Sequence, residues 1–481
     1  MQKSSPANVS FVNKGIHNVV IQRLQSQPLA WMTGVSALVL FACSSSRHAL
    51  IQSNGWDLGI FDQAVYLISQ GLPPFSSFLG FHIVGDHASF VFYPLALLYK
   101  IYPDVHWLLA VQAIALASGA LPTWYLARLA GLSTQQALTV AATYLLYPVV
   151  FNSNLFDFHP DIFALPALLW AILAARLGRV LWFCVAIAVV LACKSILALT
   201  VAGLGFWLLV FDKRRVCGAI ALVAGIAWFL IATGVIIPSF GGAQKVALSR
   251  YAYLGNSAWD VAKNLFLKPG AILPVVFSEL NLKYLLMMFL PVAWGLSPRH
   301  LTPLVGAIPA LAVNLLADYQ PQKSLTFQYS LPILPFLLVA VIATLVDGQG
   351  WLRSRRAILM WLLLFFLVLT KWTYWFTLYL PRLDTWRASR EAIALVQTEG
   401  GVLTTNQLAP HLSHRPLIYA AMSGEDLPDF SKFKYILMNG RYPDVVDRPV
   451  FVGNVVEQLK KRPDFRLRYE RDEVFLYEKV N

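Results

Sequence analysis

Long apolar segments alternate with short polar segments along the first 380 residues of the chain. Segments of about 20 apolar residues are typical of helices that cross a membrane. Residues 87–102 are apolar but short, and Pro94 interrupts them, so we expect a re-entrant or interfacial piece there. The pattern predicts about eleven transmembrane helices, at residues 29–51, 106–129, 134–152, 161–177, 179–194, 195–211, 216–237, 283–298, 301–317, 329–346 and 357–380.

From residue 381 the pattern changes to shorter elements separated by turn-forming residues. His411, His414 and Arg415 lie close together in this tail and indicate a structured turn. We therefore expect an all-α polytopic membrane protein that carries a small C-terminal α/β domain. The elements predicted in this domain are helices at 384–397 and 454–461, strands at 402–405, 416–420 and 434–439, and a hairpin at 465–479.

Composition and charge refine this picture. Hydrophobic residues make up 57% of the 481 residues and charged residues only 13%, whereas soluble proteins carry about 25% charged residues. The net charge is +13, but the basic excess lies in alternate short loops of the membrane part, so it does not indicate a nucleic-acid partner. Basic loops face the cytoplasm. The predicted parts are a cytoplasmic segment at 1–28, a transmembrane domain at 29–380 with outer loops 52–105 and 238–283, and an outer domain at 381–481.

Two carboxylates, Asp57 and Asp62, follow the first predicted span. Five residues on a helix place them about 140° apart, so we expect them to have different roles. The alternative is structural, with Asp57 as a helix N-cap and Asp62 on a solvated face. The polar positions around them share one face of an amphipathic helix suited to the membrane interface: Gly59, Asp62, Gln63, Tyr66 and Gln70.

A second acidic cluster lies between the third and fourth predicted spans, on the same predicted side of the membrane. It contains Asp157, His159 and Asp161. Two carboxylates and an imidazole are ligands that suit Mg²⁺ or Mn²⁺, so the hypothesis is a divalent-cation site that neutralises a phosphate. The alternative is that Asp161 follows Pro160 in the first turn of a helix, where the helix dipole favours a carboxylate.

Other polar groups are expected near the same surface. Asp86 and His87 form a pair that can orient an imidazole, although such pairs are also common in loops. Lys194 is predicted between two spans, where it either binds a lipid phosphate or extends its ammonium to the interface. Arg250 and Tyr251 lie in the long outer loop, and arginine suits bidentate contacts with phosphate.

Six segments of the chain resemble, in order, a prokaryotic family of polytopic membrane proteins of unknown function. That family is similar to the GT-C glycosyltransferases, which use polyprenyl-phosphate sugars as donors on the outer side of the membrane. The resemblance implies that Asp57 is the catalytic base. It also implies that Asp157, His159 and Asp161 belong to a second loop that assists with metal or donor phosphate. The segments are 56–71, 85–103, 109–128, 155–171, 250–255 and 404–419.

The chain also departs from the family pattern. Ser195 and Ile196 follow Lys194 where the family has Glu and Asp, and Gln328 stands where a histidine is expected. These departures leave a non-catalytic scaffold as one alternative. A transporter or flippase is another, although transporters place ionisable residues near the middle of the membrane, whereas here the acids gather at one surface.

The resemblance thus implies an inverting glycosyltransferase of the bacterial cytoplasmic membrane, with its site on the outer side. Its expected partners are a polyprenyl-phosphate-sugar donor, a cell-envelope acceptor and the membrane lipids, and no cofactor is expected apart from Mg²⁺ or Mn²⁺. Asp57 is the predicted base. The residues predicted to contact substrate or the donor phosphate are Asp62, Asp86, His87, Lys194, Arg250 and Tyr251.

Overall fold

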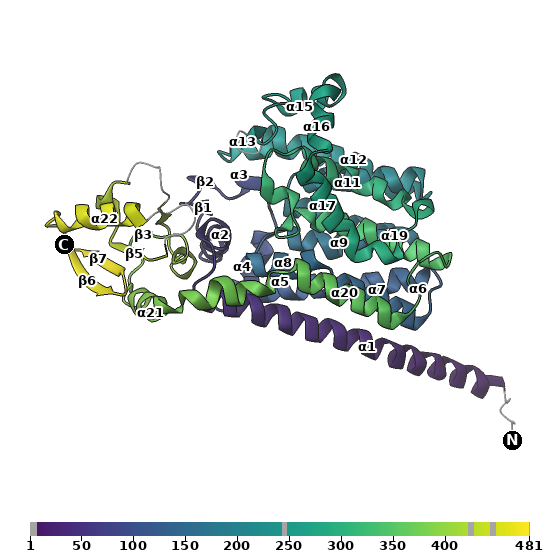
Figure 1. The fold of residues 1–481 in the computed structure, drawn as a ribbon. Coiled ribbons are helices and arrows are strands. Elements are labelled where there is room, and N and C mark those ends of the chain that lie inside the picture. The colour runs from purple at the N-terminus through teal and green to yellow at the C-terminus, as the bar shows by residue number, and fades with distance from the viewer. Residues whose placement is uncertain (1–6, 243–247, 422–427, 443–448, 481) are drawn as a thin grey trace.

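A body of packed helices carries a small sheet domain at one end (Figure 1). The computed structural model describes residues 7–242, 248–421, 428–442 and 449–480. Helix α1, Ala7–Ala49, runs along one side of the body and ends beside the sheet domain. Most of the predicted segment 1–28 therefore belongs to the same helix as the first predicted span, and its residues 1–6 lie outside the described residues.

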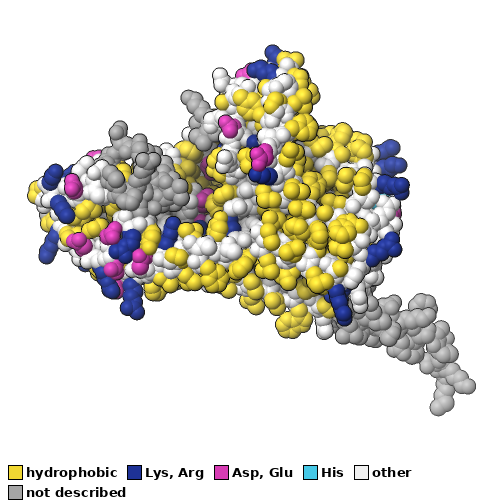
Figure 2. Space-filling view, viewed as in Figure 1, with side chains coloured by type: hydrophobic (Ala, Val, Ile, Leu, Met, Phe, Trp, Pro, Cys, Tyr) yellow, Lys and Arg dark blue, Asp and Glu magenta, His cyan; other side chains and the backbone are white. Residues whose placement is uncertain are grey.

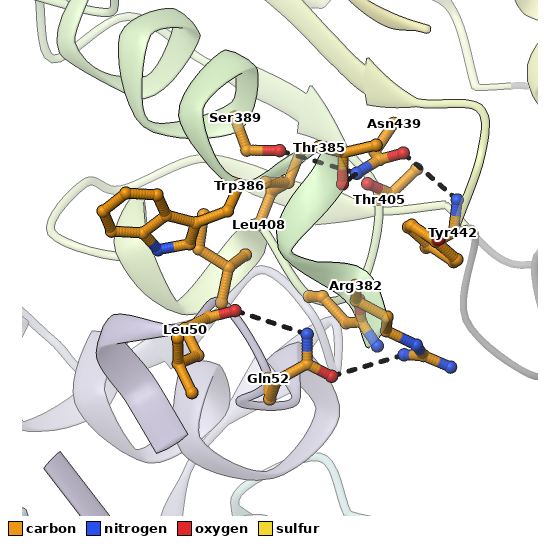
Figure 3. A pocket seen from close by; sticks show the side chains of 12 residues that line it. Leu50, Gln52, Arg382, Thr385, Trp386, Ser389, Thr405, Leu408, Asn439 and Tyr442 are labelled. Carbon is orange, nitrogen blue, oxygen red and sulfur yellow. Dashed lines mark hydrogen bonds between the residues drawn. The ribbon is translucent and has the colours of Figure 1, made fainter. Parts of the chain in front are cut away.

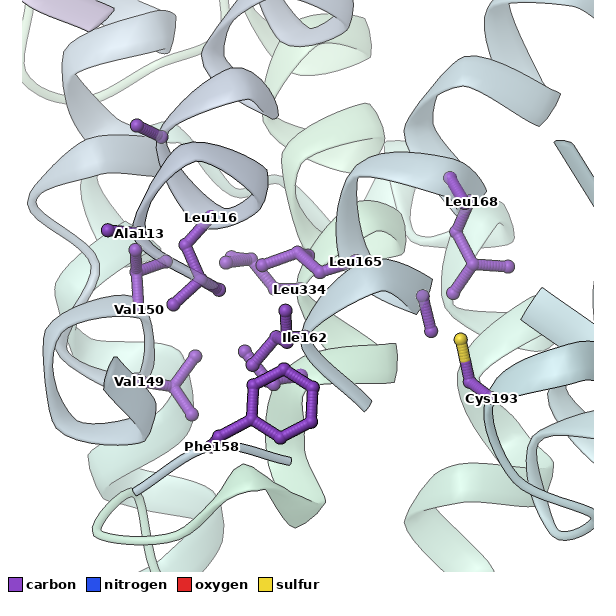
Figure 4. Packing of buried hydrophobic residues seen from close by; sticks show 14 of the residues in the cluster. Ala113, Leu116, Val149, Val150, Phe158, Ile162, Leu165, Leu168, Cys193 and Leu334 are labelled. Atoms are coloured by element: carbon purple, nitrogen blue, oxygen red, sulfur yellow. The ribbon is translucent and has the colours of Figure 1, made fainter. Parts of the chain in front are cut away.

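The core of the body forms around α9, whose side chains are buried on nearly every side. A helix that is apolar all round needs such a central position. Figure 4 shows Ile162, Leu165 and Leu168 of α9 directed towards side chains of neighbouring helices. The main helices of the body are α5 (His106–Ser118), α6 (Ala120–Leu129), α7 (Thr134–Leu145), α8 (Pro148–Phe156), α9 (Asp161–Arg176), α10 (Val180–Cys193), α11 (Leu197–Val210), α12 (Arg215–Ile231), α17 (Glu279–Phe289), α18 (Ile308–Leu316), α19 (Leu334–Val346) and α20 (Arg355–Leu369).

Large apolar side chains also cover the outside of the body, as Figure 2 shows on one face. Within the described residues, four helical stretches are long and apolar enough to cross a membrane, or six if each of two bent pairs is one span. The prediction of about eleven spans therefore stays a prediction. The four stretches are Gln27–Ala49, His106–Leu129, Arg215–Ser239 and Gln328–Val346.

Several predicted spans are broken into shorter helices. The predicted span 134–152 consists of α7 and α8, because Pro148 starts a new helix at a position where it needs no N–H donor. The last predicted span bends by 50° between α20 and the segment Lys371–Asp384. These breaks place polar backbone groups and side chains inside the body.

The segment after α1 is compact and lies between the body and the sheet domain (Figure 1). Asp62 and Gln63 of α2 are buried, so the predicted solvated polar face is wrong: the C-terminal domain covers it. Its elements are the helical turn η1 (Gly55–Gly59), helix α2 (Ile60–Ser69), strands β1 (Phe75–Ser76) and β2 (Phe81–His82), and helices α3 (Val84–His87) and α4 (Phe92–Tyr99). The predicted outer loop 238–283 carries helices α15 (Ala258–Leu267) and α16 (Pro269–Val276), and its residues 243–247 lie outside the described residues.

The C-terminal domain contains a five-stranded sheet in the order β4-β3-β5-β7-β6. Strand β3 pairs in parallel with β4 and β5, and the other pairs are antiparallel. The predicted strands, hairpin and two helices are confirmed, although α22 begins before the predicted residue 454. The elements are α21 (Trp386–Ala394), β3 (Val402–Thr404), β4 (Ile418–Ala420), β5 (Tyr435–Asn439), α22 (Pro449–Lys460), β6 (Phe465–Arg471) and β7 (Val474–Lys479).

Helices α11 and α12 approach closely through glycines. A Cβ added to Gly218 would lie 2.7 Å from the backbone nitrogen of Leu209, and one added to Gly205 would lie 2.3 Å from that of Leu222. Small residues of this kind let helix backbones approach each other in a membrane. The interface therefore has no room for a larger side chain.

We expect Gly218→Val to lower the free energy of unfolding by about 1–3 kcal/mol, because the added side chain forces the two backbones apart. Thermal unfolding of the purified protein in detergent measures the change. Gly234→Val is the control, since no atom lies within 4 Å of the Cβ position there. Equal melting temperatures for the two variants would contradict the close contact.

Candidate functional site

Asp57 and His159 lie side by side although 102 residues separate them in the chain. The imidazole Nε2 is 3.1 Å from Asp57 Oδ1. The His159 side chain is only 4% exposed, whereas that of Asp57 is 21% exposed. The imidazole thus fixes one carboxylate oxygen while the carboxylate stays accessible, as a general base requires.

The turn that carries Asp57 is held from both sides. Asn54 caps η1 by accepting a hydrogen bond from the backbone N–H two residues later, so the alternative of Asp57 as the N-cap is wrong. The Gly55 N–H donates to the side-chain oxygen of Asn406 in the C-terminal domain, 2.9 Å away. A Cβ on Gly55 would lie 2.8 Å from the Ala409 side chain, so only glycine fits this contact. The small domain therefore positions the turn of the predicted base.

Asp157 is buried and forms an ion pair with Arg47 near the end of α1. Its other carboxylate oxygen accepts a hydrogen bond from the Asn54 N–H at 3.0 Å. The Asp157 backbone has φ 123°, a conformation that is strained for a residue other than glycine. The ion pair and the hydrogen bond hold this strained turn, which delivers His159 to Asp57.

Asp161 and Lys194 form the next pair along the same loop. Their charged atoms are 2.7 Å apart, and each side chain is only 7% exposed. The N–H of Ser195 donates to the His87 carbonyl at 2.8 Å, and the His87 ring is 3.4 Å from Asp86. The structure thus brings together Asp161, Lys194 and the Asp86–His87 pair, as a group next to Asp57 and His159.

Arg250 and Tyr251 are neighbours in the chain but make different contacts. Its guanidinium lies 4.2 Å from the ring centre of Tyr319 and donates to the Gln322 side chain at 2.8 Å. The Tyr251 hydroxyl instead donates to the Val313 carbonyl at 2.8 Å. The Tyr319 ring and the Gln322 side chain therefore hold the Arg250 guanidinium in place. The Tyr251 hydroxyl instead attaches the loop to α18.

Asp62 lies apart from the site. Its carboxylate is 1% exposed and accepts hydrogen bonds from Tyr99 of α4 and Ser413 of the C-terminal domain, and the His414 imidazole lies 3.0 Å away. The predicted substrate contact of Asp62 is therefore corrected: it joins α2 to the C-terminal domain. The predicted structured turn around His414 is the other half of this junction. The different partners of Asp57 and Asp62 agree with the roles predicted from their helical spacing.

The predicted metal set is not assembled. Asp157 is paired with Arg47, Asp161 with Lys194, and His159 with Asp57. Among the described residues, no group of three or more His, Cys, Asp and Glu side chains could hold a metal ion. The residues of this loop do not fit a shared Mg²⁺ or Mn²⁺ ligand set, because cationic side chains already neutralise both of its carboxylates.

The sequence analysis missed two residues that hold the turns of the site: Arg47 and Asn406. Arg47 interrupts the end of an apolar helix. A charged residue at the end of a span is a signal for function, and it would have singled out Arg47. Asn406 carries no comparable signal, since its role depends on how the C-terminal domain meets η1.

Next to this site, the C-terminal domain is packed tightly against the body. Figure 3 shows Gln52, which follows α1, between the Leu50 carbonyl and Arg382, with Asn439 and Thr385 of the C-terminal domain above them. The cavity between these residues measures only about 10 Å³. This junction leaves almost no space for a ligand, so it serves to attach the domain.

The fold and the site define a class: a helical membrane protein in which a buried loop and a small C-terminal domain together hold an accessible carboxylate. The match of a family model to residues 47–476 identifies the group more closely. The chain belongs to the family of predicted membrane proteins DUF2079. Comparison with curated proteins gives no match.

Several solved structures are similar to this chain. The chain is similar to ArnT from Cupriavidus metallidurans bound to undecaprenyl phosphate, with a TM-score of 0.56, 11% identity, and coverage of 95% of this chain and 98% of that one. ArnT in the apo state gives a TM-score of 0.52 at 12% identity, over 92% of this chain and 98% of that one. The oligosaccharyltransferase of Archaeoglobus fulgidus gives a TM-score of 0.43 at 12% identity, over 87% of this chain and 70% of that one. The similarity to ArnT, a GT-C glycosyltransferase, confirms the coarser part of the predicted fold: a mostly helical, GT-C-like body with a small C-terminal sheet.

Removal of the Arg47 charge should destabilise the protein. We expect Arg47→Met to cost about 3–5 kcal/mol, because it leaves the buried Asp157 carboxylate without its partner. Thermal unfolding of Arg47→Met and of Arg47→Met/Asp157→Asn tests this. The double variant should recover part of the loss, and a double variant as unstable as the single one would contradict the pairing. Lys283→Met, which removes an exposed pair on α17, is the control.

The junction at Asp62 should depend on pH. Burial lowers the pKa of His414, but the neighbouring Asp62 carboxylate outweighs burial, so the pKa is raised above its ordinary 6.5. A raised folded-state pKa stabilises the fold fully below pH 6.5 and loses this contribution as pH rises through the folded-state value. Wild type should therefore exceed His414→Gln in melting temperature at pH 6 by more than at pH 9. A difference independent of pH would contradict the charged contact.

Proposed function

We propose that this protein is a membrane glycosyltransferase that transfers a sugar from a polyprenyl-phosphate donor to an acceptor on the outer side of the bacterial cytoplasmic membrane. The observation that carries the proposal is the contact between Asp57 and His159. It unites the two acidic loops that the sequence singled out and leaves an accessible carboxylate at the end of an apolar helical body. The ArnT structure with bound undecaprenyl phosphate, which shares the fold, supports a lipid phosphate as the carrier.

The proposed step is an inverting displacement. Asp57 removes the proton of an acceptor hydroxyl, and the oxygen attacks the anomeric carbon of the sugar. The bond from that carbon to the phosphate oxygen breaks, and its electron pair stays on the phosphate. Asp57 then holds the proton, and the products are the glycosylated acceptor and a polyprenyl phosphate. His159 is the positioning residue, because its imidazole holds the carboxylate oxygen at 3.1 Å.

An apolar groove provides a path for the lipid chain. It lies between α5, α9 and α10, measures about 650 Å³, and starts at Phe163, two residues after Asp161. Trp170 and Trp182 line it further along the body. An apolar wall that begins beside charged groups suits a prenyl chain whose phosphate lies at the site. The groove continues to Leu177, at the other end of α9.

Two cations of the predicted site, Arg250 and Lys194, are the candidates for stabilising the phosphate. Arg250 is the stronger of the two predicted candidates, since its guanidinium contacts an amide and an aromatic ring but has no ion pair with a described carboxylate. Lys194 is neutralised by Asp161. We therefore assign Lys194 to positioning the Asp161 loop and Arg250 to the donor phosphate.

We expect Asp57→Asn to reduce sugar transfer by about 10²- to 10⁴-fold, because the amide cannot accept the hydroxyl proton. Release of labelled sugar from a polyprenyl-phosphate-linked donor, with and without membrane extract as the source of acceptor, measures the activity. Asp347→Asn is the control, since this exposed carboxylate pairs with His300 in another loop.

The same assay separates the competing functions. Transfer by Asp57→Asn at the wild-type rate would show that another group is the base. Movement of the intact lipid across a vesicle membrane without cleavage by wild type would instead indicate a flippase. Neither cleavage nor movement by wild type would leave the scaffold function and overturn the proposal.

A further inference from the structure

Lys371 is a buried cation that the proposed step does not yet use. It lies at the 50° bend where α20 ends and the segment Lys371–Asp384 begins. Its ammonium lies 4.8 Å from the ring centre of Phe156, 5.0 Å from that of Phe327 and 5.9 Å from that of Tyr374. Three aromatic rings thus surround this charge on a residue that is only 7% exposed.

The ammonium of Lys371 has no ion pair and no hydrogen bond to any other described residue. The aromatic faces attract it, but they do not supply the oxygen acceptors that an ammonium loses when it leaves water. Buried charges in proteins are as a rule paired and hydrogen-bonded, because an unpaired one is costly. The cage therefore holds a cation that can still take an anionic partner.

The surroundings of Lys371 connect it to the proposed base. The Phe156 ring stacks on the His159 imidazole, with 5.1 Å between centres and 16° between planes. His159 in turn contacts Asp57. One aromatic ring thus contacts both the ammonium of Lys371 and the imidazole that orients the carboxylate.

The backbone of Lys371 is fixed as firmly as its side chain. The Asn152 side-chain oxygen accepts a hydrogen bond from the Lys371 N–H at 2.8 Å. The amide group of the same side chain donates to the Leu325 and Leu369 carbonyls, both at 2.9 Å. Asn152 thus joins the segment that carries Phe327 to the bend that carries Lys371, which is the arrangement expected of a pre-organised binding group.

We propose that Lys371 binds the phosphate of the polyprenyl-phosphate carrier, an inference that rests on the proposed function. The donor is a phosphodiester with one negative charge. When the bond to the anomeric carbon breaks, the phosphate keeps the electron pair and becomes a monoester with nearly two charges. A buried ammonium attracts the second charge as it develops, so its contribution is larger in the transition state than in the bound donor.

The other cations near the site have polar partners within the protein. Lys194 is 2.7 Å from Asp161, and Arg47 is paired with Asp157, so both are already neutralised. Arg250 has no such pair but already donates to Gln322 and lies over Tyr319. Lys371 differs because its ammonium makes no polar contact with the described protein.

Binding of undecaprenyl phosphate and of the neutral undecaprenol to the purified full-length protein tests the proposal. We expect Lys371→Met to weaken binding of undecaprenyl phosphate by about 10- to 100-fold, the loss of one charge-assisted contact. Binding of undecaprenol should not change. Lys371→Arg should weaken binding less than Lys371→Met does, since it keeps the charge. In the sugar-release assay, Lys371→Met should lower kcat more than it raises KM for the donor.

Lys283→Met is the matched control, because Lys283 is an exposed lysine of α17 that pairs with Glu279. Melting temperatures of all variants identify a change of folding, and Lys371→Arg keeps the test decisive if Lys371→Met is unstable. If wild type and Lys371→Met preferred undecaprenyl phosphate over undecaprenol to the same degree, the inference about Lys371 would be overturned but the proposed function would stand. Equal binding of phosphate and alcohol by wild type would overturn the proposed function as well.

Discussion

The buried ion pair between Arg47 and Asp157 is the contact on which the site depends. It joins the end of α1 to the loop before α9 across 110 residues of chain. Desolvation of two charges is costly, so such a pair is stable only where further hydrogen bonds complete it. Here the Asn54 N–H does so, and the Asp157 backbone takes up a strained φ of 123°. The result is a fixed turn that brings His159 to Asp57.

The C-terminal domain is part of the site and not an appendage. Asn406 binds the backbone of Gly55, and the Gln63 side chain donates to the Arg415 carbonyl at 3.0 Å. The loop with Asp57 is therefore enclosed between the helical body and the domain (Figure 1). This arrangement explains why the polar face of α2 is buried: its polar groups bind the domain, and the Asp62 carboxylate contacts His414 there.

The charged residues around Asp57 differ in their partners. Asp157 and Asp161 each have a cationic partner, while Asp57 has only an imidazole. The Lys371 ammonium lies beside the Phe156 and Phe327 rings and has these aromatic partners in place of a carboxylate. The proposed proton removal uses the accessible carboxylate of Asp57, and the proposed phosphate binding uses the ammonium of Lys371.

The sequence by itself determined the membrane class, the strands of the C-terminal sheet, and the two acidic loops, because hydropathy and short-range spacing are local properties of the chain. It also indicated the family, through the segments of the chain that contain Asp57 and His159. Only the tertiary structure decided that His159 of the second loop contacts Asp57, that Asp62 binds the C-terminal domain, and that Arg47 is the partner of Asp157. The physical reason is that the partner of a buried charge is chosen by helix packing, over distances of a hundred residues or more.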